Sequence, residues 1–356
     1  MKTQEKIEMH KAFWRGEGPS LILVPTKEMP LYDVDDYRER FYNPEKMWES
    51  EMARARGVLD WPTDGIPTVR PNLGVIFIPA MAGMSFDIRP DHMPWPGKHL
   101  TPEQIRSSRD VDVTQTELMQ LAVEFYQIHR ENSDGEILAY QPDNQGIFDI
   151  AHLMYGDEIF LDIVTEEKKP WVEELLEISF DLMVRASVHV KKLIGEATDE
   201  MAHGHATQQG VVFCDAGLRI SEDSPTMISP QLIDQFVIPP IERCGEHFGG
   251  IFMHYCGKHD YLFERLCRCE CVRAIDLGDP WSYDTRWLLE TCAETNTVLY
   301  SRVGAEQRES WTDYLTRVGG LVHDTAARCI LRPLVFPESR ADCERMQQLW
   351  HELTAK

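Results

Sequence analysis

The sequence has 356 residues, of which 43% are hydrophobic and 27% charged, and this balance excludes wholesale disorder because it provides ample apolar surface for a core. The formal net charge of −23 argues against nucleic acid and anionic membranes as partners, since both need a basic surface. The sequence contains neither a signal-peptide pattern nor an apolar run long enough for a bilayer, so we expect a cytoplasmic protein.

Short apolar, β-rich runs alternate with longer helical patterns along the chain, which is typical of βα units that build a parallel sheet. The predicted strands cover residues 21–24, 75–78, 137–141, 218–220, 250–254, 272–277, 297–302 and 330–334. Most of these runs are continuously apolar, as expected for parallel strands covered on both faces. We therefore predict an α/β fold, a single (β/α)8 TIM barrel over residues 1–356, with an N-terminal helical extension over residues 1–20.

The segments between these strands carry signals of their own. Residues 36–68 are predicted to form a helix followed by a loop, and residues 87–98, interrupted by three prolines, an irregular surface loop. A long helix is expected from about Glu166 to Ile194, where apolar residues recur at three- and four-residue spacing. Another helix is expected after Ser229 and Pro230, because serine is a good N-cap and proline suits the first helical turn.

Polar or ionisable side chains follow almost every predicted strand, at the carboxyl ends where barrel enzymes place catalytic groups. These residues are Asp143, Asn144, Gln145, Glu222, Asp223, His254, Cys256, Asp276, Asp279, Arg302 and Arg332. A purely structural rim would not require so many such groups. The pattern therefore predicts an enzyme.

Several segments, taken in order, resemble a known superfamily. They are residues 11–17, residues 142–151 followed by 156–158, and residues 222–230, which continue through Phe236 and Pro239 to the His-Tyr-Cys-Gly of residues 254–257. Together they cover most of the chain, and they resemble the uroporphyrinogen-decarboxylase superfamily. That superfamily includes the haem-pathway decarboxylase, corrinoid-dependent methyltransferases and, more distantly, cobalamin-independent methionine synthase.

Two features place the resemblance closer to the methyltransferase branch. The decarboxylase carries an arginine-rich signature just after its first strand, whereas residues 24–28 here contain no arginine pair. The methyltransferase branch carries a His-x-Cys on the fifth strand, which holds zinc together with a distant cysteine, and this chain has His254 and Cys256. Relatives without zinc also carry a His-x-Cys-Gly at this place, so a hydrogen-bonded histidine without metal is the alternative interpretation.

His254 and Cys256 can converge on one ion, because residues two apart on a strand point to the same side and zinc accepts both ligand types. The resemblance implies Cys329 as the third ligand. The predicted strand, however, places Cys329 at its start, the end of a barrel strand that serves stability. Asp276 and Asp279 are the alternative third ligands.

The other cysteines are interpreted as core thiols. The 9 cysteines are an odd, irregularly spaced set, which is typical of reduced thiols rather than a disulfide framework. Cys267, Cys269 and Cys271 stand two apart, a spacing that cannot face one way on a helix, and no second paired cluster accompanies them.

Asp223 and Glu222 are catalytic candidates together with His254. Adjacent residues on an extended segment point in opposite directions, so we expect Asp223 to enter the site as a base or as a partner of a substrate cation. Glu222 is then expected to bond the backbone around Ser229. The substrate-binding candidates are Asp143, Asn144, Gln145, His205 in a polar loop before the fourth strand, and Arg302 and Arg332, whose guanidinium groups suit a carboxylate or phosphate but equally suit rim salt bridges.

These observations predict a zinc-dependent, methyltransferase-like enzyme that moves a methyl group between a small donor or thiol and a corrinoid. The resemblance implies that a partner protein carries the corrinoid, and a homodimer is a further expectation. The alternative is a metal-free decarboxylase or lyase whose arginines hold a carboxylate substrate. A binding protein without turnover is the third interpretation.

Overall fold

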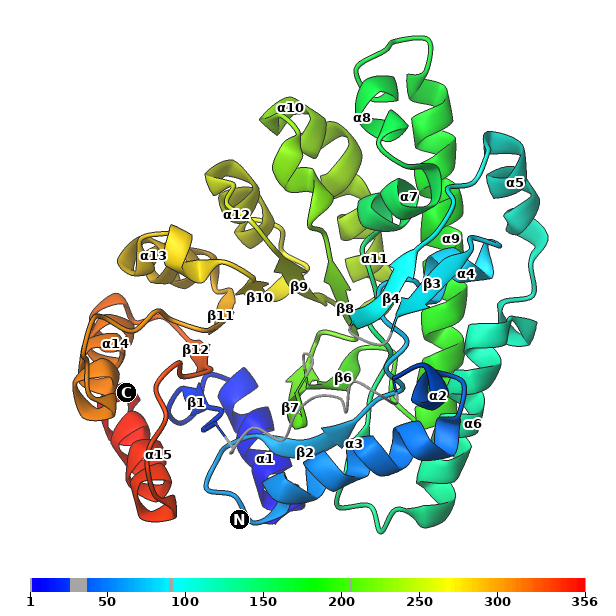
Figure 1. Cartoon of the computed structure of the whole chain (residues 1–356). Coiled ribbons are helices and arrows are strands. Elements are labelled where there is room, and N and C mark those ends of the chain that lie inside the picture. Colours follow the sequence, from blue (N-terminus) through cyan, green and yellow to red (C-terminus); the bar gives the residue numbers. More distant parts are fainter. Residues whose placement is uncertain (1, 26–36, 90–91, 205–206, 356) are drawn as a thin grey trace.

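The computed structural model describes residues 2–25, 37–89, 92–204 and 207–355. It is a mixed α/β structure in which most strands lie toward the centre and helices surround them (Figure 1). The strands are β1 Leu21–Ile22, β2 Ile66–Val69, β3 Phe86–Arg89, β4 His92–Pro96, β5 Leu138–Ala139, β6 Glu200–His203, β7 Gln209–Cys214, β8 Leu218–Ser221, β9 Ile251–Tyr255, β10 Val272–Leu277, β11 Val298–Ser301 and β12 Cys329–Leu331.

The helices confirm the predicted alternation with strands along most of the chain. They are α1 Thr3–Trp14, α2 Tyr37–Phe41, α3 Pro44–Leu59, α4 Phe77–Met81, α5 Pro102–Ser107, α6 Glu117–Asn132, α7 Ile147–Tyr155, α8 Glu158–Asp162, α9 Lys169–Ile194, α10 Pro230–Leu232, α11 Ile238–Phe248, α12 Asp260–Cys267, α13 Thr285–Thr295, α14 Trp311–Thr325 and α15 Arg340–Thr354. Helix α9 is the predicted long helix. The helix predicted after Pro230 forms as α10 and α11, joined by a π-helical turn at Ile233–Val237.

A six-stranded parallel sheet runs in the order β1-β12-β11-β10-β9-β8. Its strands are short apolar runs, and all five residues of β9 are buried, because both faces of the sheet are covered. One face packs against helices, and we call it the outer side. The other face packs against α1 and the β6–β7 hairpin, and we call it the inner side.

A second sheet has the order β5-β2-β7-β6, and the segments that follow β5 and precede β2 are linked to the first sheet by backbone hydrogen bonding at two places. Gln145 forms an isolated parallel bridge with Ser221 of β8. At the other edge the backbone N–H of Asp64 donates to the carbonyl of Ile22 in β1 at 3.0 Å. The six-stranded parallel sheet therefore lies beside a four-stranded sheet with parallel and antiparallel pairs. No continuous strand pairing joins the two sheets among the described residues.

The inner side is filled by α1 and the β6–β7 hairpin. The sequence analysis did not predict the two strands of this hairpin. The Phe213 ring of β7 stacks on Phe252 of β9 with centroids 4.7 Å apart, and Trp14 of α1 lies against Phe213 at 5.2 Å. The buried members of this inner cluster are Phe13, Leu21, Leu23, Met201, Val211, Phe213, Ala216, Phe252, Ala274, Val298, Tyr300 and Ile330. The inner side is thus packed by apolar side chains at the level of Phe252, and the candidate site residues lie beyond this layer, at the carboxyl ends of the strands.

Two predictions between residues 60 and 100 were wrong. The second strand is β2, Ile66–Val69, whereas the first two residues of the predicted strand 75–78 form a turn and the last two begin the buried helix α4. A short, fully buried helix is as uniformly apolar as a parallel strand, so periodicity cannot separate them. Residues 87–98, predicted as a loop, contain most of the antiparallel β3–β4 hairpin, where prolines are tolerated because both strands are edges.

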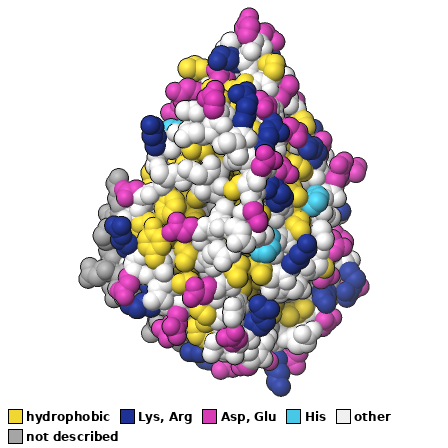
Figure 2. Space-filling view, turned by 90° about the vertical axis from the view of Figure 1, so that its right-hand side faces the viewer, with side chains coloured by type: hydrophobic (Ala, Val, Ile, Leu, Met, Phe, Trp, Pro, Cys, Tyr) yellow, Lys and Arg dark blue, Asp and Glu magenta, His cyan; other side chains and the backbone are white. Residues whose placement is uncertain are grey.

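On the face in Figure 2, Asp and Glu side chains are interleaved with Lys and Arg. Such interleaving fits a surface whose charge serves solubility. Among the described residues, no helix combines the length and the apolar character needed to cross a membrane.

Candidate metal centre

The register of three adjacent strands brings the candidate residues to one level of the sheet. Ser221 of β8 pairs with His254 of β9, and His254 pairs with Asp276 of β10. These side chains lie on the inner side, two residues beyond the Phe252 layer. Asp223 and Cys256 follow two residues later on the same side. We call this carboxyl end of the inner side the mouth.

Asp223, His254 and Cys256 form one cluster at the mouth. One ligand atom from each lies within 4.8 Å of the others, and the Cys256 Sγ is 3.5 Å from the His254 Nε2. A carboxylate, an imidazole and a thiol are all ligands that zinc accepts. The residues therefore fit a zinc ion by donor chemistry, with Asp223 in the place that the sequence assigned to Cys329, Asp276 or Asp279.

Asp276 orients the imidazole of His254. Its Oδ2 lies 2.7 Å from the His254 Nδ1, and the aspartate is fully buried. A carboxylate accepts this hydrogen bond, so Nδ1 carries a proton, and Nε2 is the ring nitrogen that faces the cluster, where it can bind a metal when unprotonated. Asp276 thus acts behind the histidine, as carboxylates commonly do behind metal-binding imidazoles.

Hydrogen bonds to the backbone hold the segment that carries Cys256. Asp223 Oδ1 accepts from the N–H of Cys256 at 2.6 Å, and Asp279 Oδ2 accepts from the N–H of Gly257 at 2.8 Å. Burial, followed by the charges of Asp223 and Asp279, raises the pKa of the Cys256 thiol to about 12. Metal binding would release the thiol proton, because the thiolate is the ligand.

Glu222 lies on the opposite side of its segment from Asp223, as predicted, but its partner is not the backbone around Ser229. Its two carboxyl oxygens accept from the N–H groups of Phe148 at 3.1 Å and Asp149 at 3.0 Å, at the beginning of helix α7. Glu222 is fully buried. The structure therefore gives this residue a structural position and not one at the mouth.

Asp149 completes a reciprocal arrangement that the sequence did not reveal. Its oxygens accept from the N–H groups of Asp223 and Ser224, each at 2.8 Å. Burial and the neighbouring carboxyl groups raise the pKa of both Asp149 and Glu222. The two acids fasten the segment after β8 to helix α7 and thereby position Asp223. The only signal in the sequence that could have indicated this role is the position of Asp149, a single acidic residue inside an apolar helical segment.

The predicted substrate-binding residues fall into two groups. Arg302 and Arg332 follow β11 and β12 on the inner side. Asp143 instead forms ion pairs with Arg219 and, at 3.6 Å, with Arg70. Both arginines are buried, and the sequence analysis did not single them out. Arg70 escaped notice because β2 was not recognised, and Arg219 because it lies within a strand.

The remaining candidates are not placed in the cluster. Asn144 bonds the side chains of Gln141 and Ser187, and Gln145 is buried at its bridge with Ser221. His205 lies outside the described residues. Cys329 is fully buried at the start of β12, at the amino end of the sheet, so the thiol and the cluster are at opposite ends. Cys267 and Cys269 are buried and Cys271 is partly buried, as predicted for core thiols.

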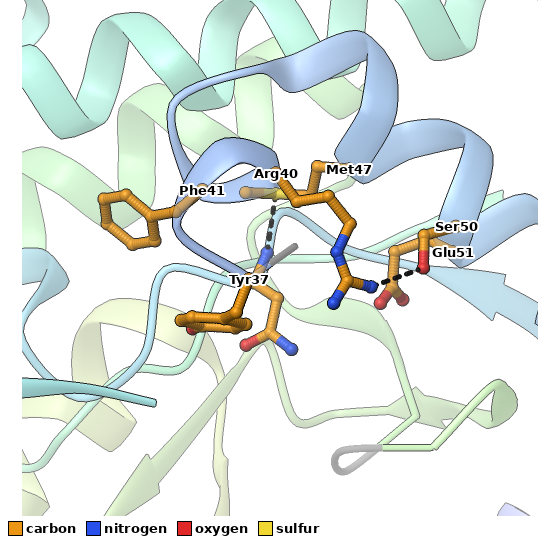
Figure 3. Close-up of a pocket in the computed structure, with 7 residues that line it drawn as sticks. Tyr37, Arg40, Phe41, Met47, Ser50 and Glu51 are labelled. Carbon is orange, nitrogen blue, oxygen red and sulfur yellow. Dashed lines mark hydrogen bonds between the residues drawn. The ribbon is translucent and has the colours of Figure 1, made fainter. Parts of the chain in front are cut away.

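A small pocket lies between α2, α3 and the chain after β2 (Figure 3). Arg40 donates to the Ser50 hydroxyl at 3.1 Å, and the N–H of Asn72 points to the sulfur of Met47 at 3.2 Å. None of its lining residues is a predicted site residue. The cluster at the mouth, not this pocket, gathers the candidate chemistry.

Comparison with known proteins gives a fold likeness only. No family model matches the chain, and no curated protein matches it in sequence. Among solved structures it is similar to a protein titled "methyltransferase from Methanosarcina mazei", with a TM-score of 0.67 and 14% identity, covering 99% of this chain and 98% of that one. The chain therefore has a methyltransferase-like fold over its whole length.

Proposed function

We propose that this protein is a zinc-dependent, methyltransferase-like enzyme that moves a methyl group between a small donor or thiol and a corrinoid carried by a partner protein. The observation that carries the proposal is the cluster of Asp223, His254 and Cys256 within 4.8 Å. The fold likeness to a protein named a methyltransferase adds support. The corrinoid partner rests on the superfamily resemblance.

Each residue of the cluster has a distinct task in this proposal. Asp223, His254 and Cys256 would hold zinc, which when bound lowers the pKa of a substrate thiol. Three protein ligands leave one position for substrate, the arrangement of catalytic rather than structural zinc sites. Asp276 keeps the imidazole in the tautomer that presents an unprotonated Nε2, and Asp279 holds the backbone beside Cys256.

We further infer that β1, β2, β5 and β8–β12 belong to one (β/α)8 barrel. The Gln145–Ser221 bridge and the Asp64–Ile22 hydrogen bond lie at the two places where such a ring would close. The cluster then lies at the carboxyl ends of the strands, where barrel enzymes place their chemistry.

The metal-free decarboxylase is the second candidate, and Arg302 and Arg332 favour it. Both stand at the mouth without a carboxylate partner in the described part of the chain, as a carboxylate-binding site requires. The two candidates differ in whether the protein holds a metal.

Metal content by mass spectrometry tests the proposal on protein purified from zinc-replete medium. We expect about one zinc per chain in the wild type and none in the variant that combines His254→Ala with Cys256→Ala. Cys214→Ser, at a half-buried thiol outside the cluster, is the matched control and should keep the zinc. Metal-free wild type would reject the zinc mechanism and favour the decarboxylase.

A further inference from the structure

Two buried cysteines lie against each other between neighbouring helices on the outer side of the parallel sheet (Figure 1). Cys267 ends helix α12, and Cys292 lies in helix α13. A hydrogen bond joins their two thiols, and both side chains are almost fully buried. Because a thiol is a weak hydrogen-bonding group, the packing of the two helices rather than this bond holds the sulfurs together. The two sulfurs can therefore meet without a large movement of either helix.

The main chain fixes the spacing of these two cysteines independently of their sulfurs. Thr297, the residue before β11, donates its hydroxyl to the carbonyl of Cys267 at 3.2 Å. Its backbone N–H donates to the carbonyl of Cys292 at 2.9 Å, and Thr297 is itself buried. One residue thus bonds the backbone of both cysteines, so their proximity is part of the packed structure.

The next two cysteines of the Cys-x-Cys-x-Cys run have partners of a different kind. The Sγ of Cys269 lies 3.2 Å from Nη1 of Arg265. The thiol of Cys271 is directed to the carbonyl of Ile241 at 3.8 Å. The hydrogen bond of Cys267 goes instead to a thiol on another helix, which makes this member of the run a candidate for chemistry between two sulfurs.

The apolar surroundings decide which chemistry the pair can undergo. The hydrogen bond with Cys267, together with burial, raises the pKa of Cys292 well above its ordinary value. A soft monovalent metal ion held by two thiolates carries a net negative charge, which burial opposes. A third buried thiol, Cys329, lies near Cys292, but in the described part of the chain no third ligand atom joins the pair closely enough for a metal site. A disulfide is neutral and leaves no charge in this interior.

We propose that Cys267 and Cys292 form a reversible disulfide that ties α12 to α13 when the protein meets a low-molecular-weight disulfide as oxidant. The step is thiol–disulfide exchange. The first cysteine, as its thiolate, attacks the oxidant, forms a mixed disulfide and releases one small thiol. The second cysteine attacks the mixed disulfide, forms the Cys267–Cys292 bond and releases the other small thiol. The protein loses two electrons and the protons of its two thiols, and the two released thiols take them up.

Burial sets the condition for this exchange. The attacking species is a thiolate in contact with the oxidant, and neither is available while both sulfurs are shielded from solvent. Exchange therefore requires a local opening of α12 and α13, of the kind that folded proteins undergo without unfolding globally. These helices begin shortly after the segments that carry Cys256 and Asp279. The disulfide would thus fix the spacing of two helices that adjoin the mouth, and the inference does not depend on the proposed zinc function.

The test incubates full-length protein in mixtures that range from reduced to oxidised glutathione, at urea concentrations below the unfolding transition. Mass spectrometry of peptides, after alkylation of the remaining thiols, shows which cysteines are joined. We expect all 9 cysteines to be free in reduced glutathione, and Cys267 to be joined to Cys292 in oxidised glutathione. The oxidised protein should unfold at a higher urea concentration than the reduced one, because the cross-link restricts the unfolded chain. Dithiothreitol should reverse both changes.

Cys292→Ser should prevent the disulfide, whereas Cys343→Ser, at a buried thiol on α15, should form it as the wild type does. The peptide map of the wild type decides the proposal even where a serine variant is too unstable to compare. Free Cys267 and Cys292 under the most oxidising condition would overturn the proposal, as would glutathione bound only at the exposed Cys256. A disulfide that joins Cys292 to Cys329 would overturn it as well.

Discussion

Two glycines, one beside Glu222 and one beside Cys256, make room for the side chains around them. A Cβ at Gly146 would lie 2.2 Å from the carboxyl carbon of Glu222, and a Cβ at Gly278 would lie 2.4 Å from the Cys256 Sγ. Neither glycine has a positive φ, so space and not backbone conformation requires them. Glu222 and Cys256 lie so close to these two glycines that no volume remains for an alanine methyl group at either position.

The tightest of these contacts gives a stability prediction. Gly146→Ala should destabilise the protein by about 1–3 kcal/mol, because the new methyl group displaces the buried Glu222 carboxyl from the N–H groups at the start of α7. Unfolding in urea measures the change.

Gly57→Ala is the matched control. A Cβ there meets nothing within 4 Å, and Gly57 lies in helix α3, so this variant should gain about 0.5–1 kcal/mol from helix propensity. Equal effects of the two substitutions would contradict the role given to Gly146.

At the scale of elements, α1 is fastened by polar contacts as well as by the inner cluster. The ring of His10 bridges two segments, because its Nδ1 accepts from the N–H of Val212 at 3.1 Å and its Nε2 contacts the Asp64 carbonyl at 2.8 Å. An Nδ1 that accepts a hydrogen bond is unprotonated, so His10 is neutral with its proton on Nε2. The same Asp64 accepts from Ile22 and His351, which links β1 and α15 to α1.

This neutral histidine makes the stability of the fold depend on pH. Burial lowers the pKa of His10 from 6.5 to about 4, against an opposing contribution from Asp64 and with a smaller one from nearby Lys6. The unfolded chain therefore binds a proton between these values that the folded chain does not. The contribution of the neutral His10 to the free energy of unfolding is fully present above pH 6.5 and is lost as the pH falls toward 4. The loss is at most about 3 kcal/mol.

Urea unfolding across this pH range checks the prediction by comparing the wild type with His10→Gln. The wild type should lose more stability on acidification than His10→Gln. His323→Gln, at an exposed position on α14, should follow the wild type. A His10→Gln variant with the same acid loss as the wild type would show that another group controls it.

At the scale of the whole molecule, metal binding and folding should be linked. The three proposed ligands come together only in the folded chain, so zinc at a hundredfold excess over its dissociation constant should stabilise the protein by about 2.7 kcal/mol. Thermal unfolding with and without zinc measures the shift. Cys256→Ser should reduce the shift strongly. Cys329→Ser should leave this zinc-dependent shift unchanged, whatever its effect on the stability of the metal-free protein. Loss of the shift in Cys329→Ser would instead indicate that Cys329 is a zinc ligand.

The sequence predicted seven of the strands within a few residues, because parallel strands covered on both faces are short, continuously apolar runs. It missed β2 and the β3–β4 and β6–β7 hairpins. Strand β2 contains Pro67 and Thr68. Strands β6 and β7 stand on either side of the polar loop that the sequence predicted around His205. Local composition could not show that either segment packs against the rest of the core.

The sequence by itself determined the α/β alternation and the polar carboxyl ends of the strands, because apolar runs and the residues that follow them are local features. It also determined the pairing of His254 with Cys256, because side chains two apart on a strand point to the same side. Only the tertiary structure decided the third member of the cluster. Asp223 reaches the cluster because β8 lies beside β9. Cys329 does not reach it because Cys329 lies at the amino end of β12, whereas the cluster lies at the carboxyl ends of the strands. The roles of Glu222 and Asp149 were also set there, since each depends on a partner in a segment distant along the chain.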